Sequence, residues 1–170
     1  MSDDRAIRFA AVYENCYGAI HAYASRRVGA EPADEIAAET FLVAWRKFDA
    51  LPSDPLPWLY GVARNMVARH HEANRRQHQA RTVLERERRP PDPGQEGDDP
   101  RLWEAWARLS AADREVLALV AWEELSVADA ARAFGCTAPV FSVRLHRARR
   151  RLQRLLAQDR SLSSMEPVEA

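Results

Sequence analysis

Cysteine and lysine are both scarce in this chain of 170 residues. The only two cysteines, Cys16 and Cys136, lie far apart and form no CxxC pair. A disulfide framework or a zinc site built on cysteine is therefore not expected. Lys47 is the only lysine, so 24 of the 25 basic residues are arginines, which favour bidentate contacts to phosphate and guanine. The net charge is zero, which argues against a coat-like nucleic-acid binder and leaves local charge patches to act.

Long hydrophobic runs and catalytic signatures are also missing. No stretch of 18 apolar residues and no signal-peptide pattern occurs, so we expect a cytoplasmic protein that does not enter a membrane. His70 and His71, together with His78, lack a metal-binding spacing such as HExxH. We find no nucleophile–base pair and no phosphate-binding loop. The sequence therefore predicts a protein that is not an enzyme and that needs no metal or cofactor.

Strand signals are absent as well, because no stretch alternates apolar and polar side chains with β-branched enrichment. Residues 86–100 (RERRPPDPGQEGDDP) contain four prolines and two glycines among polar residues, which is typical of a linker. We predict an all-α fold of two small helical domains joined by a flexible linker, the C-terminal domain being a helix-turn-helix. The predicted boundaries are 1–81 for the first domain, 82–100 for the linker, 101–158 for the second domain and 159–170 for a tail.

Three amphipathic helices are expected in the first domain. The first ends near Gly29, and the second begins around Pro32 to Asp34, with acidic residues in its first turn as the helix dipole prefers. The third follows the proline-rich loop LPSDPLP. Apolar residues at steps of three and four mark the expected buried faces. These are Phe9, Val12, Cys16, Ile20 and Tyr23 in the first helix; Ile36, Thr40, Phe41, Val43, Ala44, Trp45 and Phe48 in the second; and Leu59, Val62, Ala63, Met66, Val67 and His70 in the third.

The segment from Ser126 to Leu156 is the most informative part of the chain. An apolar stripe of Phe141, Leu145, Ala148, Leu152 and Leu155 runs beside an arginine stripe of Arg144, Arg147, Arg151 and Arg154. From residue 136 to residue 160 there are seven arginines and one aspartate, a local charge of +6. A helix that is buried along one side and cationic along the next fits a DNA groove.

The residues before this arginine-rich helix have the turn chemistry of a helix-turn-helix. Gly135 lies where a helix end needs a positive φ, Thr137 can cap the next helix, and Pro139 falls in its first turn. A helix, a short turn containing glycine and a second helix form the helix-turn-helix pattern. The alternative from the residues alone is a solvated helix in an αα-hairpin, since arginine also favours helices.

Three segments in order resemble bacterial sigma factors of the extracytoplasmic-function type, within the sigma-70 family. DEIAAETFLVAWRKFD is similar to the core-polymerase-binding helix of region two, and PWLYGVARNMVARHH to the helix of the same region that meets the promoter −10 element. LSAADREVLALVAWEELSVADAARAFG, followed by VRLHRARRRL, is similar to region four, which reads the −35 element. The resemblance implies an all-α initiation factor with two partners, core RNA polymerase (the clamp helices of its largest subunit) and promoter DNA. It also implies an anti-sigma factor that holds the protein inactive.

The resemblance assigns expected roles to residues in each segment. For core-polymerase binding these are Asp34, Glu35, Ile36, Glu39, Thr40, Phe41 and Trp45. For the −10 element they are Ser53, Asp54, Trp58, Gly61, Arg64, Asn65 and Arg69. For the −35 element they are Thr137, Pro139, Val140, Ser142, Val143, Arg144, Arg147 and Arg151.

The sequence departs from the family pattern at two places. The start of the last helix is apolar where several polar side chains usually face base edges, so Val140 or Val143 is expected to meet a thymine methyl, and −35 specificity to be looser or to lean on DNA shape. Ala38 stands where a polar residue is usual in the polymerase-binding helix. Two other functions stay open: a helix-turn-helix regulator that acts without polymerase, and a helical interaction protein that binds no nucleic acid.

Overall fold

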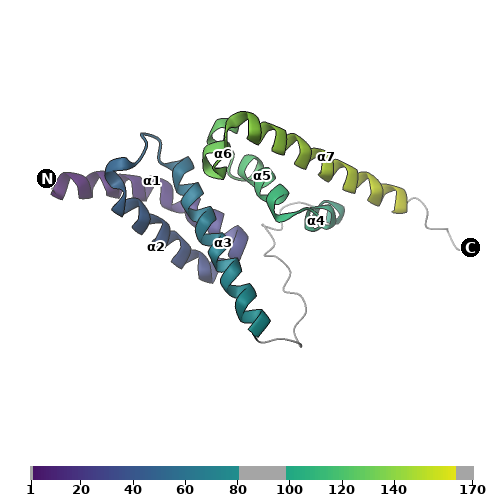
Figure 1. The fold of residues 1–170 in the computed structure, drawn as a ribbon, viewed down its shortest axis with the longest axis horizontal. Coiled ribbons are helices and arrows are strands. Elements are labelled where there is room, and N and C mark those ends of the chain that lie inside the picture. The colour runs from purple at the N-terminus through teal and green to yellow at the C-terminus, as the bar shows by residue number, and fades with distance from the viewer. Residues whose placement is uncertain (1, 81–98, 164–170) are drawn as a thin grey trace, which may run out of the picture. The chain divides into compact units, whose positions relative to one another are not determined.

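The computed structural model describes residues 2–80 and 99–163, and within these ranges the chain forms helices and no strand. The helices are α1 (Ser2–Val28), α2 (Ala30–Arg46), α3 (Leu56–Ala80), α4 (Pro100–Ala107), α5 (Ala111–Ala121), α6 (Val127–Phe134) and α7 (Ala138–Ser163), with a 3-10 turn at Phe48–Ala50. They build two compact units (Figure 1). In the first unit α1, α2 and α3 pack on one another, and in the second α4 and α5 pack on α7. The predicted all-α fold is confirmed.

The core of the first unit forms where the three predicted apolar faces meet. Ile20 and Tyr23 of α1, Ala37 of α2, and Leu59 and Ala63 of α3 are fully buried. Burying an aliphatic side chain of this size stabilises the unit by about 1.5–3 kcal/mol. The stripes predicted from spacing therefore supply most of the centre of this unit. In α2 the outcome differs at two positions: Ala37, which was not assigned to the buried face, is fully buried, whereas Trp45, which was assigned to it, is 37% exposed.

Two details of the first unit differ from the sequence expectation. α2 begins at Ala30, before the predicted start, because Gly29 adopts a φ of 88° and lets the chain turn directly from α1 into α2. Pro32 then lies in the first turn, where a missing N–H costs little. Tyr60 of α3 is also buried, although it was not assigned to the core, and its ring centroid lies 5.3 Å from that of Tyr23.

Local side-chain caps fix the starts of α5 and α6 in the second unit. The Ser110 hydroxyl accepts a hydrogen bond from the Asp113 amide and donates one to the Asp113 carboxylate, at the start of α5. Ser126 and Asp129 repeat this arrangement at the start of α6. Such caps satisfy amides that have no partner within the helix, which is why both helices begin at these serines.

The turn between α6 and α7 has glycine and proline in the positions that the sequence predicted. Gly135 has a φ of 79°, the left-handed conformation that glycine adopts without steric cost. Thr137 immediately precedes α7, and its carbonyl accepts a hydrogen bond from the Phe141 amide. Pro139 is the second residue of α7. Cys136 lies in the same turn and is half-buried. α6 and α7 thus form a helix-turn-helix.

Replacing Gly135 with alanine is expected to lower the free energy of unfolding of the helix-turn-helix by about 1–2 kcal/mol, the cost of a left-handed L-residue. No atom lies within 4 Å of the added Cβ, so the cost is that of the backbone alone. The measurement is urea denaturation of the full chain. Gly18→Ala is the control, because Gly18 lies inside α1 with equally open space around it and should gain about 0.5–1 kcal/mol. Unchanged stability of the Gly135 variant would show that this turn does not hold its conformation in solution.

The segment predicted as a linker falls mostly outside the described residues, and so does most of the predicted tail. Pro100, the last residue assigned to the linker, opens α4, and Asp99 before it caps this helix, since its side chain accepts a hydrogen bond from the Arg101 amide. α7 continues to Ser163, beyond the predicted domain end at residue 158. The reason is that no glycine or proline interrupts the helix there.

Candidate nucleic-acid interface

The outer side of α2 is an exposed face that combines acidic and apolar side chains. Glu35, Glu39, Leu42 and Trp45 follow one another at steps of three and four and are all exposed. Leu42 is 47% exposed and Trp45 37%, which is high for such large apolar residues. We call these four residues the α2 face. Its pairing of carboxylates with exposed apolar groups suits a partner surface that is both basic and apolar.

Three of the residues expected at a polymerase contact lie instead in the core. Ile36 and Phe41 are 5% and 3% exposed, and Thr40 is fully buried. The Thr40 hydroxyl donates a hydrogen bond to the Ile36 carbonyl at 2.7 Å, which satisfies it inside the helix. The expectation that all seven residues share one contact surface is therefore corrected, because these three side chains point into the α1–α3 core and support the exposed residues from behind.

Two members of the predicted polymerase contact are held by α1. The Asp34 carboxylate lies 3.1 Å from His21 Nε2. Tyr17 of α1 interacts with the same carboxylate. The pKa of its phenol is raised, mainly by partial desolvation and secondly by the negative charge of Asp34. The Trp45 ring lies edge-on to Phe9 at 5.0 Å and beneath the Arg5 guanidinium at 4.9 Å. The Trp45 ring is thus fixed in orientation while part of its surface stays exposed.

The predicted −10 residues lie on α3 and on the loop before it. Ser53 and Asp54 are exposed in the loop, and Asn65 and Arg69 are exposed on α3. The other three, Trp58, Gly61 and Arg64, are half-buried. The structure therefore presents four of these seven residues openly.

Further along α3 a group of charges pairs within the helix. Arg75 and Arg76 both donate hydrogen bonds to the Glu72 carboxylate. These bonds lower the pKa of the Glu72 carboxyl, and the one from Arg75 has the larger effect. These two guanidinium groups were not among the predicted DNA contacts.

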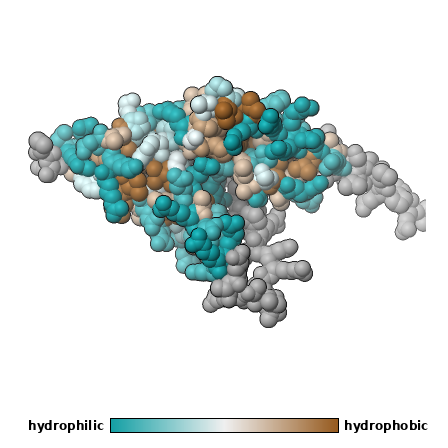
Figure 2. All heavy atoms as spheres, viewed as in Figure 1, coloured by the Kyte–Doolittle hydropathy of each residue, from teal (hydrophilic) through white to brown (hydrophobic). Residues whose placement is uncertain are grey.

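α7 has the two-sided character that its sequence predicted. Phe141, Leu145 and Ala148 are buried against the rest of the second unit. The eight residues expected at the −35 element are all exposed: Thr137, Pro139, Val140, Ser142, Val143, Arg144, Arg147 and Arg151. Figure 2 shows hydrophobic colour over the first turns of α7 and hydrophilic colour along the remainder of the helix. Arginines thus follow an apolar start on the exposed side of one helix.

The first turns of α7 offer few hydrogen-bonding groups. Val140 and Val143 are 45% and 50% exposed. The Ser142 hydroxyl donates to the Ala138 carbonyl at 3.0 Å, so its proton is already used inside the helix. Arg144 is consequently the main donor that this part of α7 can present to a base edge.

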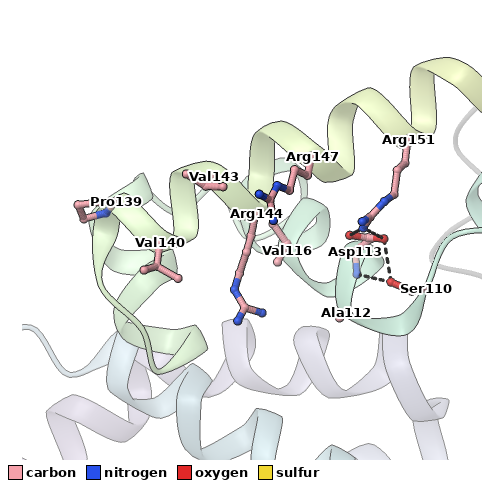
Figure 3. Close-up of a pocket in the computed structure, with 10 residues that line it drawn as sticks. All are labelled: Ser110, Ala112, Asp113, Val116, Pro139, Val140, Val143, Arg144, Arg147 and Arg151. Carbon is pink, nitrogen blue, oxygen red and sulfur yellow. Dashed lines mark hydrogen bonds and ion pairs between the residues drawn. The ribbon is translucent and has the colours of Figure 1, made fainter.

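A groove of about 580 Å³ runs between the start of α5 and the first half of α7. Apolar groups form one end of it and arginines the other (Figure 3). Its lining residues are Ser110, Ala112, Asp113, Val116, Pro139, Val140, Val143, Arg144, Arg147 and Arg151. The groove shares six residues with the predicted −35 set.

Two features of these surfaces were missed from the sequence. Leu42 belongs to the α2 face, and the signal was present, since it falls seven residues after Glu35 on the charged side of the helix. The ion pair between Asp113 and Arg151 had no signal in the sequence, because it joins residues 38 positions apart.

No cluster of three or more histidine, cysteine, aspartate or glutamate side chains among the described residues could hold a metal ion. Within residues 2–80 and 99–163, every helix is too short or too polar to span a bilayer.

Two family models match the chain, one in each unit. Residues 12–77 match Sigma-70 region 2, and residues 100–152 match Sigma-70, region 4. The first therefore covers most of α1, all of α2 and most of α3, and the second runs from α4 into the middle of α7.

Curated relatives match over most of the chain. The ECF RNA polymerase sigma factor BldN of Streptomyces coelicolor is 32% identical over 161 residues, covering 89% of this chain and 61% of the relative. The chain thus spans about three fifths of that relative's length. The RNA polymerase sigma factor NccH of Alcaligenes xylosoxydans xylosoxydans is 29% identical over 153 residues, covering 82% of each protein.

Solved structures give the same result for the fold. The sigma factor RpoE of Bartonella quintana, crystallised with the anti-sigma factor NepR, is 28% identical with a TM-score of 0.64, over 88% of this chain and 97% of that one. The structure of CnrH in complex with the cytosolic domain of CnrY has a TM-score of 0.58 at 23% identity, over 89% and 88% of the two chains, and supports the fold alone.

Proposed function

Because the chain belongs to the extracytoplasmic-function group of the sigma-70 family, we propose that it is a promoter-specificity subunit of RNA polymerase. In this role it binds core polymerase, places its two units on the −10 and −35 elements and helps to melt the start region. Catalysis belongs to the polymerase. The observation that carries the proposal is the presence in one chain of the α2 face and of an arginine-lined helix-turn-helix.

In this proposal, each surface has its own ligand. The α2 face binds the clamp helices of the largest polymerase subunit, with Glu35 and Glu39 opposite basic groups and Leu42 and Trp45 in apolar contact. Asn65 and Arg69 of α3 meet the opened −10 strand, where cationic groups and exposed bases dominate binding. The exposed side of α7 enters the major groove at the −35 element.

We also propose that an anti-sigma factor binds this chain and competes with polymerase or DNA. The support is the RpoE structure, which was solved with the anti-sigma factor NepR and matches most of this chain. The groove beside α7 adds a physical reason, since any partner seated there covers residues predicted to read DNA.

Run-off transcription tests the proposed function. Fragmented host DNA is transcribed by bacterial core polymerase with and without the full chain, and RNA 5′ ends are sequenced. We expect new starts that depend on the protein and share paired upstream motifs. If the protein is folded and binds DNA but produces no new transcription start site, the result would favour a helix-turn-helix regulator that acts without polymerase.

The apolar start of α7 leads to a prediction about −35 recognition. If Val140 and Val143 contact thymine methyls, replacing −35 thymines with deoxyuridine removes these methyls and should weaken holoenzyme binding. We expect a loss of about fourfold for each contacted methyl, because burying one such carbon contributes roughly 0.8 kcal/mol. Electrophoretic mobility shifts on the mapped promoters measure this ratio.

The matched controls for this prediction change the protein and the DNA separately. In the Val140→Ala, Val143→Ala variant, thymine and deoxyuridine promoters should bind with similar affinity. Deoxyuridine in the spacer between the two elements should have no effect. Equal sensitivity of variant and wild type would assign −35 recognition to DNA shape instead.

A further inference from the structure

Arg151 differs from the other arginines of α7 because a carboxylate of its own chain engages it. Its Nη1 atom donates to both carboxylate oxygens of Asp113 at 2.7 Å (Figure 3). Asp113 is nearly buried, with its side chain 12% exposed, whereas the Arg151 side chain is 49% exposed. The Ser110 hydroxyl donates to the same carboxylate at 2.8 Å. One buried acid thus ties the start of α5 to the middle of α7.

Arg147 provides the contrast, one turn earlier on the same stripe. Among the residues that the structure describes, the Arg147 guanidinium has no hydrogen-bond or ion-pair partner. It is exposed and lines the same groove. Two neighbouring arginines of the stripe thus differ: Arg151 is neutralised by a carboxylate of its own chain, and Arg147 is not.

The Asp113 contact makes a phosphate contact by Arg151 unfavourable. A phosphate that drew Arg151 away would leave a nearly buried carboxylate without its cation, which is costly. It would also come close to the negative charge of Asp113, and like charges at an interface repel. The start of α5 stabilises Asp113 further, because a carboxylate is favoured at the positive end of a helix.

We propose that Arg151 is a positioning residue: it clamps Asp113 and so fixes α7 on α5, while Arg147 contacts DNA phosphate. The clamp sets the position of Val140, Val143 and Arg144 at the −35 element. This inference rests on the proposed function and revises the sequence expectation that Arg151 itself binds DNA.

The clamp is tested first without DNA or polymerase. Asp113→Asn, Arg151→Gln and the double variant form a double-mutant cycle in thermal unfolding of the full chain. Each single change should lower the melting temperature of the second unit by at least about 4–8 °C, because even a modest loss of stability shifts the melting temperature of a unit of this size by that amount. The melting temperature of the double variant should fall by clearly less than the sum of the two single decreases. Strictly additive shifts would overturn the clamp.

The role in DNA binding is tested by the salt dependence of holoenzyme binding to a mapped promoter. Arg147→Gln should reduce the slope of log K against log salt by about 0.9, the loss of one phosphate contact. Arg151→Gln should leave the slope unchanged but weaken specific binding roughly tenfold, as loss of one good base contact does. Non-specific binding should not change. A slope reduced by the same amount in both variants would overturn the proposal.

Removing the acid while keeping the arginine separates positioning from simple loss of a cation. Because Asp113→Asn breaks the clamp and leaves the Arg151 cation in place, it should weaken specific binding about as much as Arg151→Gln does. Specific binding that is unchanged or tighter in Asp113→Asn would identify Arg151 as a phosphate ligand. Failure of every holoenzyme to bind promoters would overturn the proposed function, and the DNA role with it, while the unfolding cycle would still decide the clamp.

Discussion

Association with core polymerase should fall at least about 100-fold, or ~2.7 kcal/mol, when Glu35 and Glu39 are both replaced by arginine. Both carboxylates are exposed on the α2 face, so the substitutions leave the α1–α3 core intact. In the proposed complex they lie opposite basic groups, and placing like charges together at an interface costs several kcal/mol. Fluorescence anisotropy of the labelled full chain, titrated with core polymerase, gives the dissociation constant.

The control for this result makes the same change in charge elsewhere. Glu14 of α1 and Glu104 of α4 are exposed and lie outside every predicted contact. The variant Glu14→Arg, Glu104→Arg should bind core polymerase as the wild type does. If the α2 variant also binds normally, the α2 face is not the polymerase contact, and a regulator that works without polymerase becomes the better explanation.

The second large effect concerns stability. Phe141→Ala should lower the free energy of unfolding of the second unit by about 3–5 kcal/mol, the cost of removing a buried aromatic ring. Phe141 is fully buried on α7. A unit of this size is stabilised by only about 3–10 kcal/mol in total, so the variant should be largely or partly unfolded.

Hydrogen exchange followed by mass spectrometry distinguishes the two units in this experiment. Amides of α5 and α7 should lose protection, whereas those of α1 and α3 should keep it. Val143→Ala is the matched control, since Val143 lies two residues further along the same helix and is half exposed. Its effect should stay within about 0.5 kcal/mol. Full protection of α7 in the Phe141 variant would contradict the role of this ring in the core.

The sequence predicted well those features that depend on short-range periodicity and on backbone chemistry. The stripe containing Phe141 and Leu145 is buried as predicted, because a spacing of three and four defines one side of a helix. The positive φ of Gly135 was predicted because a tight turn after a helix requires it. Both features are set by residues within a few positions of one another.

Features that depend on how helices pack were predicted less well. The Asp113–Arg151 pair forms only when α5 and α7 come together, and nothing in the local sequence of either residue indicates it. Thr40 and Ile36 were assigned to a partner surface by resemblance, whereas their burial depends on where α1 and α3 pack on α2. A helix with apolar residues on more than half of its circumference does not reveal from sequence which part faces inward.

The alternation along α7 has a consequence for how promoter preference evolves. The residues that hold α7 in the fold, such as Phe141 and Leu145, are buried, while the intervening Val140 and Val143 are exposed. Substitutions at the exposed positions should change stability by no more than about 0.5 kcal/mol. If α7 reads the −35 element as proposed, a duplicated copy of this protein can therefore acquire a different −35 preference by single steps without passing through an unfolded intermediate, and two copies can diverge to control separate sets of genes.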